Sequence, residues 1–310
     1  MLYFDNAATT SIDEEVLNTY TNALKKYYNN PSATHRFGME GNNLLLSAKR
    51  QIAKYLSFTG CKEDEIILTS GATESNNLAI KGYVERYKKR GKHLITTKVE
   101  HPSVLNVYKN FEQSGYDVTY LDVTPSGIDE NALKSALRDD TILVSIMAVN
   151  NEVGSIQPLA EIAEVLKKYP KIHFHVDAVQ GMAKGIHDLI FNDRVDFITF
   201  SGHKFHAPRG IGFIYGKNGR KINPLMDGGG QERGQRSGTE NLPAIVGMAK
   251  AVRIVKDHEN ESIVTEQAIR EKIYHHIIKL DKVRIFSKLN DHFAHHILCF
   301  AILGVKGEKK

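Results

Sequence analysis

Between residues 60 and 216, short runs rich in β-branched and aromatic residues alternate with stretches whose apolar residues recur at helical spacing. The runs comprise residues 65–69, 93–97, 118–121, 142–146, 173–176, 197–200 and 212–215, and the helical stretches include residues 77–89, 131–138 and 159–168. Such alternation is typical of α/β proteins. The sequence therefore predicts a mainly parallel, seven-stranded sheet flanked by helices, with ligands at the carboxyl ends of the strands.

The residues after about 245 have a different character and predict a second, smaller domain. A long charged helical stretch covers residues 249–279, and strand-like runs follow at residues 283–286 and 296–303. We expect a large domain over residues 1–245 and the start of a small α+β domain over residues 246–310, which ends before it is complete. The first 15 residues are expected to pack with the small domain.

Composition excludes several classes of protein. The 41 Lys and Arg against 36 Asp and Glu leave a net charge of +5, and basic residues alternate with acidic ones, so we expect no direct nucleic-acid binding. No run approaches the roughly 18 apolar residues of a membrane helix, and the start of the chain does not resemble a signal peptide. Two cysteines are too few for a disulfide framework. We therefore expect a cytoplasmic protein.

The turn at residues 69–76 runs from a predicted strand through glycine and small hydroxyl residues into a helix. Glycine lets the backbone approach a ligand, and exposed N–H groups and the helix dipole favour an anion, so Thr73 and its neighbours suit a phosphate. The same residues are equally typical of an ordinary helix N-cap. The turn alone leaves both interpretations open.

Asp177 and Lys204 follow two later strands. Asp177 alone is equally consistent with a helix N-cap, whereas Lys204 follows a Ser-Gly-His turn, where an amine can be held near a cofactor and its pKa lowered. A phosphate cradle, an acid for a heterocyclic nitrogen and a lysine for an aldehyde together meet the needs of pyridoxal phosphate. His101 follows the strand at residues 93–97 and is placed to stack on such a ring.

With these motifs, the whole chain resembles the NifS-type cysteine desulfurases, which are class V aminotransferases and fold-type I pyridoxal phosphate enzymes. The resemblance rests on residues 3–10, 30–38, 69–76, 100–101, 150–154, 175–180, 201–204 and 228–239, in the family's order and spacing. It implies a transferase that converts L-cysteine to L-alanine and carries the sulfur as an enzyme-bound persulfide. It also implies transfer of that sulfur to an acceptor protein, for tRNA thiolation or iron–sulfur cluster assembly.

The resemblance assigns roles around the cofactor ring. Lys204 would form the Schiff base and, once freed by the substrate, remove its α-proton. His101 would stack on the pyridine, and Asp177 would pair with the pyridine nitrogen. Asn151 would contact the substrate side, and Gln180 the ring hydroxyl.

The resemblance also places residues around the cofactor phosphate. These residues are Ala72, Thr73, Ser201 and His203. Thr239, in the glycine-rich segment 228–239, would reach the phosphate of the neighbouring subunit. This implies a homodimer with shared sites.

The chain departs from the family pattern at the thiol that attacks the substrate sulfur. In the family this cysteine lies in a Ser/Gly-rich loop beyond the strand predicted here at residues 296–303, and we find no such loop. Cys61 precedes the strand at residues 65–69, about 20 Å from its carboxyl end. Cys299 falls in an apolar run typical of a buried side chain. We expect neither to be the nucleophile and interpret the chain as C-terminally truncated.

Two alternatives to an active desulfurase therefore remain. One is a catalytically impaired or non-catalytic protein that binds cofactor, dimerises or docks a partner. The other is residual pyridoxal phosphate chemistry such as β-elimination. The C-terminal histidines lack the spacing and companion ligands of a metal site, so we predict no metal there. They are His275, His276, His292, His295 and His296.

Overall fold

The computed structural model describes residues 2–56 and 60–305. Its main strands are β1 (Ile66–Thr69), β2 (His93–Thr97), β3 (Asp117–Leu121), β6 (Thr141–Met147), β7 (His173–Asp177), β8 (Phe197–Ser201) and β9 (Gly212–Gly216). They form one seven-stranded sheet in the order β1-β9-β8-β7-β6-β2-β3. β9 runs antiparallel to both neighbours, and the other pairs are parallel. The predicted mainly parallel sheet is confirmed.

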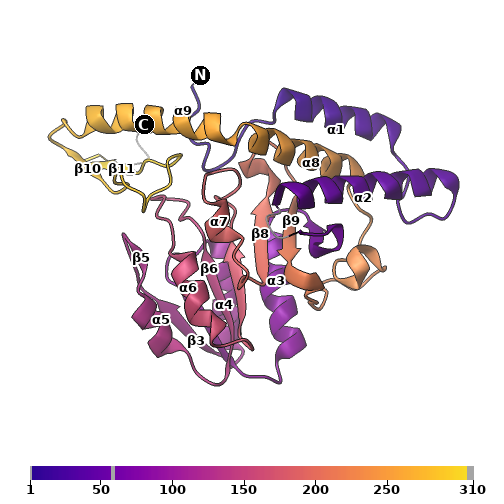
Figure 1. The fold of residues 1–310 in the computed structure, drawn as a ribbon, viewed down its shortest axis with the longest axis horizontal. Coiled ribbons are helices and arrows are strands. Elements are labelled where there is room, and N and C mark those ends of the chain that lie inside the picture. The colour runs from indigo at the N-terminus through magenta and orange to yellow at the C-terminus, as the bar shows by residue number, and fades with distance from the viewer. Residues whose placement is uncertain (1, 57–59, 306–310) are drawn as a thin grey trace.

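Helices cover both faces of this sheet (Figure 1). They are α3 (Ala72–Tyr87), α4 (Pro102–Gln113), α5 (Glu130–Ala136), α6 (Leu159–Lys167) and α7 (His187–Ile190). On one face, α3 and α4 bury Tyr83 and Tyr108, whereas α6 buries Ile162 on the other. Side chains alternate along a strand, so Ile214 of β9 joins the first core and Phe213 the second. The sheet is therefore buried on both faces.

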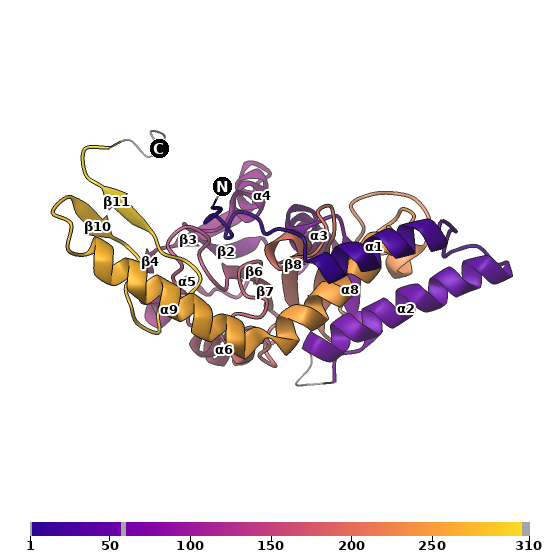
Figure 2. The same ribbon diagram turned by 90° about the horizontal axis from the view of Figure 1, so that it is seen from above.

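A further group of helices lies outside this sandwich (Figure 2). It consists of α1 (Glu14–Lys26), α2 (Arg36–Leu56), α8 (Leu242–Asp257) and α9 (Glu259–Ile277). α8 packs against both α1 and α2, and α9 continues from it away from this pair. The stretch at residues 249–279 is helical as predicted, but it divides into two helices at His258. Within the described ranges, no helix has the length and apolar character needed to cross a membrane.

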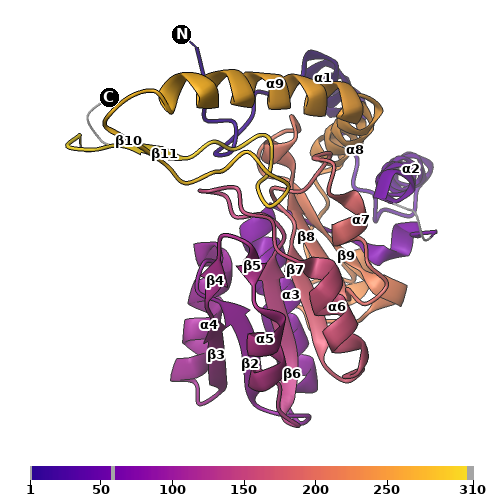
Figure 3. The same cartoon turned by 60° about the vertical axis from the view of Figure 1, so that its left-hand side comes forward.

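α9 and the strand pair β10 (Val283–Ile285) and β11 (Phe300–Ile302) lie across one end of the main sheet (Figure 3). The strand predicted at residues 296–303 is wrong in its first half, because the ladder with β10 begins only at Phe300. The backbone just before it bonds elsewhere: Ala294 N donates to Gly154 O at 2.7 Å. A second small sheet pairs β4 (Val123–Thr124) with β5 (Gly127–Ile128). The domain boundary at residue 245 stays a prediction.

The N-terminal segment is fixed beside the turn that follows β8. Thr10 N donates to His203 O at 2.8 Å, and His206 N donates to Thr10 Oγ1 at 2.8 Å. Asp13, which caps α1, also donates its N–H to His206 O. These contacts join the start of the chain to the predicted large domain. Short 3₁₀ helices lie at Glu63–Glu65, Gly202–Lys204, Lys217–Gly219 and Gln231–Gly234.

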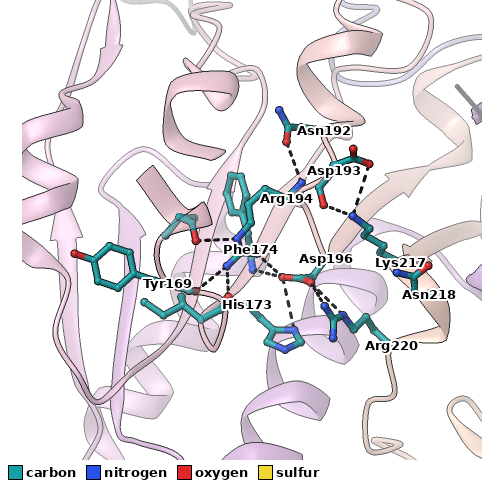
Figure 4. A network of polar contacts seen from close by, with 12 residues as sticks. Tyr169, His173, Phe174, Asn192, Asp193, Arg194, Asp196, Lys217, Asn218 and Arg220 are labelled. Atoms are coloured by element: carbon teal, nitrogen blue, oxygen red, sulfur yellow. Dashed lines mark hydrogen bonds and ion pairs between the residues drawn. The ribbon is translucent and has the colours of Figure 1, made fainter. Parts of the chain in front are cut away.

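A buried carboxylate joins the starts of β7 and β8 to the turn after β9 (Figure 4). The Asp196 side chain is only 5% exposed. It accepts hydrogen bonds from Phe174 N at 3.0 Å, Arg194 Nη1 at 2.9 Å and Arg220 Nε at 3.1 Å. Arg194 also donates to the carbonyl oxygens of Leu166 and Tyr169. One buried anion thus binds two guanidinium groups and a strand N–H.

Candidate active site

A cavity of about 800 Å³ lies at the carboxyl ends of the central strands. Its walls come from the N-terminal segment, from the turns after β1, β2, β6, β7 and β8, and from the segment before β11. The predicted residues that line it are Ala72, Thr73, His101, Asn151, Asp177, Gln180, Ser201, His203 and Lys204. Thr239, the remaining predicted residue, is exposed in the segment 228–239 and lies outside this cavity. The fold therefore gathers residues from most of the chain into one site.

The turn between β1 and α3 has the features of an anion site. Gly71 precedes the helix with φ +150°, and no side chain caps the N-terminus of α3. Gly212 of β9 lies so close that an added Cβ would come within 2.7 Å of Gly71 Cα. Thr73 and Ser201 supply hydroxyl groups to the cavity beside this turn. An uncapped helix N-terminus with hydroxyl groups nearby suits a phosphate.

A carboxylate lies in the first turn of the same helix, and an arginine neutralises it. Glu74 accepts hydrogen bonds from Arg236 Nε at 2.7 Å, Arg236 Nη2 at 3.2 Å and Ser70 N at 2.7 Å. Burial opposes ionisation, but the hydrogen bonds outweigh it and lower the pKa of Glu74. The sequence analysis missed this pair because Arg236 is 162 positions away, and no local pattern reveals the contact.

Asp177 ends β7 and is held by two donors. Its Oδ1 accepts from Val179 N at 3.1 Å, and its Oδ2 accepts from Asn76 Nδ2 at 2.7 Å. Burial raises the pKa of Asp177, while these hydrogen bonds and the charge of Lys204 oppose the rise. Asn76 also escaped the sequence analysis. It faces the sheet one turn into α3, where its amide oxygen accepts from Thr199 Oγ1 at 2.5 Å.

Lys204 closes the 3₁₀ turn after β8 and points its amine toward the N-terminal segment. Lys204 Nζ donates to Ala7 O at 2.6 Å and to Ala8 O at 2.9 Å. Burial lowers the pKa of Lys204, although the charges of Asp177 and Asp5 oppose this shift. A buried amine with a lowered pKa is suited to carbonyl chemistry and to accepting a proton.

His101 is the N-cap of α4 and lines the same cavity. Its Nδ1 accepts a hydrogen bond from Ser103 N at 3.1 Å. A neutral ring that accepts at Nδ1 carries its proton on Nε2. The capping contact therefore fixes both the tautomer and the position of the ring.

A model of the family described as "Aminotransferase class-V" matches residues 2–309. The chain belongs to this family. The match extends over both the cavity residues and the segment from α8 to β11.

Among the relatives of this class V aminotransferase are proteins named as NifS homologues and cysteine desulfurases. A "NifS/IcsS protein homolog" of Lactobacillus delbrueckii subsp. bulgaricus is 51% identical over 309 residues, covering 99% of this chain and 80% of its own length. A "Putative cysteine desulfurase IscS 1" of Bacillus subtilis is 44% identical, covering 86% of this chain and 70% of its own length. A solved "NIFS-LIKE PROTEIN" has TM-score 0.92 at 38% identity, covering 99% of this chain and 83% of its own. The NifS-type resemblance and the fold-type I architecture are confirmed.

In this class V aminotransferase, both cysteines lie outside the cavity lining. Burial, followed by the charge of Glu65, raises the pKa of Cys61 to about 12, and Cys61 lies at the amino end of β1. Cys299 is half-buried directly after the cavity residue Leu298, and burial raises its pKa as well. Because the thiolate is the nucleophile, a raised pKa disfavours both residues for attack on sulfur.

Two of the five C-terminal histidines meet an acid that the sequence analysis overlooked. His295 Nε2 lies 3.1 Å from Glu266 Oε2, and one ligand atom each of His295, His296 and Glu266 lies within 4.8 Å of the others. Lys184 Nζ donates to Glu266 Oε1 at 2.6 Å. Since the lysine already balances the carboxylate charge, these contacts favour an ion-pair cluster over a metal site. The absence of a metal stays a prediction.

Glu100, next to His101, is a buried acid with one satisfied oxygen. Its Oε1 accepts from Thr97 Oγ1 and from Met147 N, both at 2.8 Å, while Oε2 is buried and has no hydrogen-bond partner among residues 2–56 and 60–305. Burial, opposed by the bond from Met147, raises the pKa of Glu100 from 4.5 to about 8. Burial therefore favours the protonated side chain in the folded protein.

Replacing Glu100 with glutamine is expected to remove part of the pH dependence of stability. Since the pKa of Glu100 is raised on folding, its stabilising contribution is complete below pH 4.5 and is lost as the pH rises through 8. Glutamine keeps the shape and does not ionise. The free energy of unfolding, measured in urea, should therefore differ between Glu100→Gln and the unsubstituted protein by an amount that depends on pH. From about pH 5 to pH 9, this difference should shift by roughly 2–4 kcal/mol in favour of Glu100→Gln.

The exposed Glu161 provides the matched control. Glu161→Gln should differ from the unsubstituted protein by a constant amount across the same pH range. A constant difference for Glu100→Gln as well would show that Glu100 is ionised throughout.

Proposed function

We propose that the chain is a pyridoxal phosphate-dependent cysteine desulfurase, which converts L-cysteine to L-alanine and passes the sulfur to a thiol. One observation carries this proposal: the amine of Lys204, the carboxylate of Asp177 and the uncapped N-terminus of α3 converge on one cavity. These groups match the aldehyde, the ring nitrogen and the phosphate of the cofactor. The names of the relatives support L-cysteine as the substrate.

The residues present fit this cofactor. Thr73 and Ser201 surround the glycine turn that would bind the phosphate, together with Ala72 and His203. Asp177 is fixed by Asn76 Nδ2 at 2.7 Å, so its carboxylate is oriented before any ligand arrives. His101, anchored through Nδ1, would stack on the ring. The cavity volume of about 800 Å³ is ample for the cofactor with an amino acid.

The bound cofactor supplies a conjugated ring that takes up the negative charge left when an amino acid loses its α-proton. Asp177 would hold a proton on the ring nitrogen and so stabilise that charge. Lys204 would hold the aldehyde carbon and, once displaced, take the α-proton at Nζ. Because the pKa of Lys204 is lowered, a larger fraction of the side chain is the neutral amine that can accept this proton. Asn151, at the cavity wall, would orient the substrate.

The source of the sulfur-accepting thiol is a separate part of the proposal. Both cysteines lie outside the cavity lining and have raised pKa values. We therefore assign the acceptor thiol to a group other than Cys61 and Cys299. The same observation favours a second candidate function. In it, the chain binds the cofactor and removes the α-proton of amino acids, but forms no persulfide on Cys61 or Cys299.

We also propose that the chain acts as a homodimer in the cytoplasm. Thr239 supports the dimer, because it is exposed and lies outside the cavity of its own chain. Arg236 anchors the segment that carries it to Glu74, beside the phosphate turn. A partner subunit would thus receive Thr239 from a loop already fixed in place.

The proposal is tested by incubating the purified chain with pyridoxal phosphate, L-cysteine and an excess of a small thiol. We expect a change in cofactor absorbance on mixing, and then release of alanine with formation of a persulfide on the small thiol. A second thiol molecule attacks this persulfide, which forms a disulfide and releases sulfide. The double variant Cys61→Ser/Cys299→Ser should form alanine at the same rate. Loss of alanine formation in that variant would show that one of these thiols is the nucleophile. No change in cofactor absorbance would contradict the proposed function itself.

Replacing Arg236 with alanine is expected to weaken pyridoxal phosphate binding about tenfold, because Glu74 would then present an unbalanced charge beside the phosphate. The double variant Glu74→Gln/Arg236→Ala removes both charges and should recover most of the affinity. Equilibrium titration, followed by cofactor absorbance or protein fluorescence, measures the affinity of each variant for pyridoxal phosphate. Equal losses in the single and double variants would mean that Arg236 acts by holding the loop and not by neutralising Glu74.

A further inference from the structure

His296 lies where the C-terminal segment reaches the cavity wall. Its Nε2 is 3.3 Å from Gln180 Oε1, and Gln180 Nε2 donates to Ala7 O at 2.8 Å. The same carbonyl oxygen of Ala7 accepts from Lys204 Nζ at 2.6 Å. Gln180 therefore links His296 of the C-terminal segment to Ala7 O, the carbonyl oxygen that also binds the Lys204 amine.

The chemistry of these partners fixes which end of the Gln180 amide faces which neighbour. A carbonyl oxygen only accepts hydrogen bonds, so the NH₂ group must face Ala7. The amide oxygen then faces His296, and an oxygen needs a donor. His296 must therefore carry its proton on Nε2 and leave Nδ1 unprotonated.

The surroundings of His296 support a neutral ring that has one proton to donate. Its Nδ1 is buried and has no hydrogen-bond partner within the described residues. The charged groups that face the ring are Lys184, Glu266, His295 and Arg270. Burial, followed by the positive charge of Lys184, lowers the pKa of His296 to about 3. The neutral His296 ring therefore donates its one N–H, at Nε2, to Gln180 Oε1.

We propose that His296 is a positioning residue that, together with Ala7 O, holds the Gln180 amide in one orientation at the cavity wall, with its NH₂ group toward Ala7 and its oxygen toward His296. Resting on the proposed function, this would let the C-terminal segment restrain the Gln180 side chain, which would donate a hydrogen bond to the ring hydroxyl of the cofactor. Without His296, Ala7 O alone would hold the amide, and the NH₂ group would be less firmly fixed as a donor to that hydroxyl. The orientation of Gln180 thus rests on two contacts, one with Ala7 and one with a residue 116 positions away.

The first experiment uses the protein without cofactor and is independent of the proposed function. Long-range ¹H–¹⁵N spectra should show His296 as the Nε2–H tautomer. With selective ¹⁵N-glutamine labelling, the Gln180 NH₂ protons should exchange slowly with solvent in the unsubstituted protein and in His296→Gln, which retains a donor. In His296→Leu they should exchange at least about tenfold faster. An Nδ1–H tautomer, or unchanged exchange in His296→Leu, would overturn the proposal.

The second experiment adds pyridoxal phosphate and follows its absorbance against pH. A donor to an oxygen that carries negative charge lowers its proton affinity, so losing it should raise the absorbance midpoint of His296→Leu by about 0.5–1 pH unit. His296→Gln should restore the midpoint, and the exposed control His292→Leu should not change it. An unchanged midpoint in His296→Leu would refute the role of His296 toward the cofactor. If the unsubstituted protein binds no cofactor, the proposed function fails, while the tautomer and exchange data still decide the His296–Gln180 contact.

Discussion

Replacing Lys204 with alanine is expected to abolish alanine formation from L-cysteine, with a loss of at least about a thousandfold. The substitution removes the only amine that lines the cavity in the described part of the chain. It also removes the hydrogen bonds that Lys204 Nζ donates to the carbonyl oxygens of Ala7 at 2.6 Å and Ala8 at 2.9 Å. The measurement is the rate of alanine release with saturating pyridoxal phosphate.

Lys98→Ala is the matched control for this prediction. Lys98 is exposed and pairs with Asp122 at 2.7 Å, outside the cavity. Its removal should leave the rate within about twofold of the unsubstituted protein. If Lys204→Ala kept a comparable rate, the amine that accepts the α-proton would have to be another group.

Replacing Asp196 with alanine is expected to lower the free energy of unfolding by about 3–5 kcal/mol. The substitution leaves two guanidinium groups, from Arg194 and Arg220, without their buried anion. It also leaves Phe174 N without its acceptor inside the sheet. Urea unfolding at neutral pH, followed by circular dichroism, measures the change.

The neighbouring Asp193 gives a control in the same turn (Figure 4). Its side chain is 81% exposed, and its contact with Lys217 is 3.7 Å long. Asp193→Ala should change stability by less than about 0.5 kcal/mol. Equal losses for Asp193→Ala and Asp196→Ala would mean that the turn is fragile in general and that the buried charge network is not its main support.

The sheet and most of the cavity could be predicted because their signals are local. A buried parallel strand appears in the sequence as a short run of β-branched and apolar residues, as at residues 142–146. A polar residue directly after such a run indicates a strand end that can bind a ligand, and Asp177 follows residues 173–176 in this way. The topology then brings these strand ends together at one edge of the sheet.

The contacts that depend on distant residues could not be predicted in this way. The fold brings Arg236 to Glu74 and His296 to Gln180, although the members of these pairs are 162 and 116 positions apart in the sequence. Asp196 appears in the sequence as an ordinary acid before a strand, and only the fold surrounds it with arginines. The start of the predicted strand at residues 296–303 is also wrong, because pairing with β10, and not local composition, decides where β11 begins.

The central claim is that Lys204 holds pyridoxal phosphate in the cavity at the strand ends. It is tested most directly by mixing the purified chain with one equivalent of the cofactor, reducing with borohydride and mapping the pyridoxyl group by peptide mass spectrometry. We predict a single modified residue, Lys204, and no stoichiometric modification in the variant Lys204→Ala. Modification spread over surface lysines, or concentrated on a lysine outside the cavity, would contradict the claim.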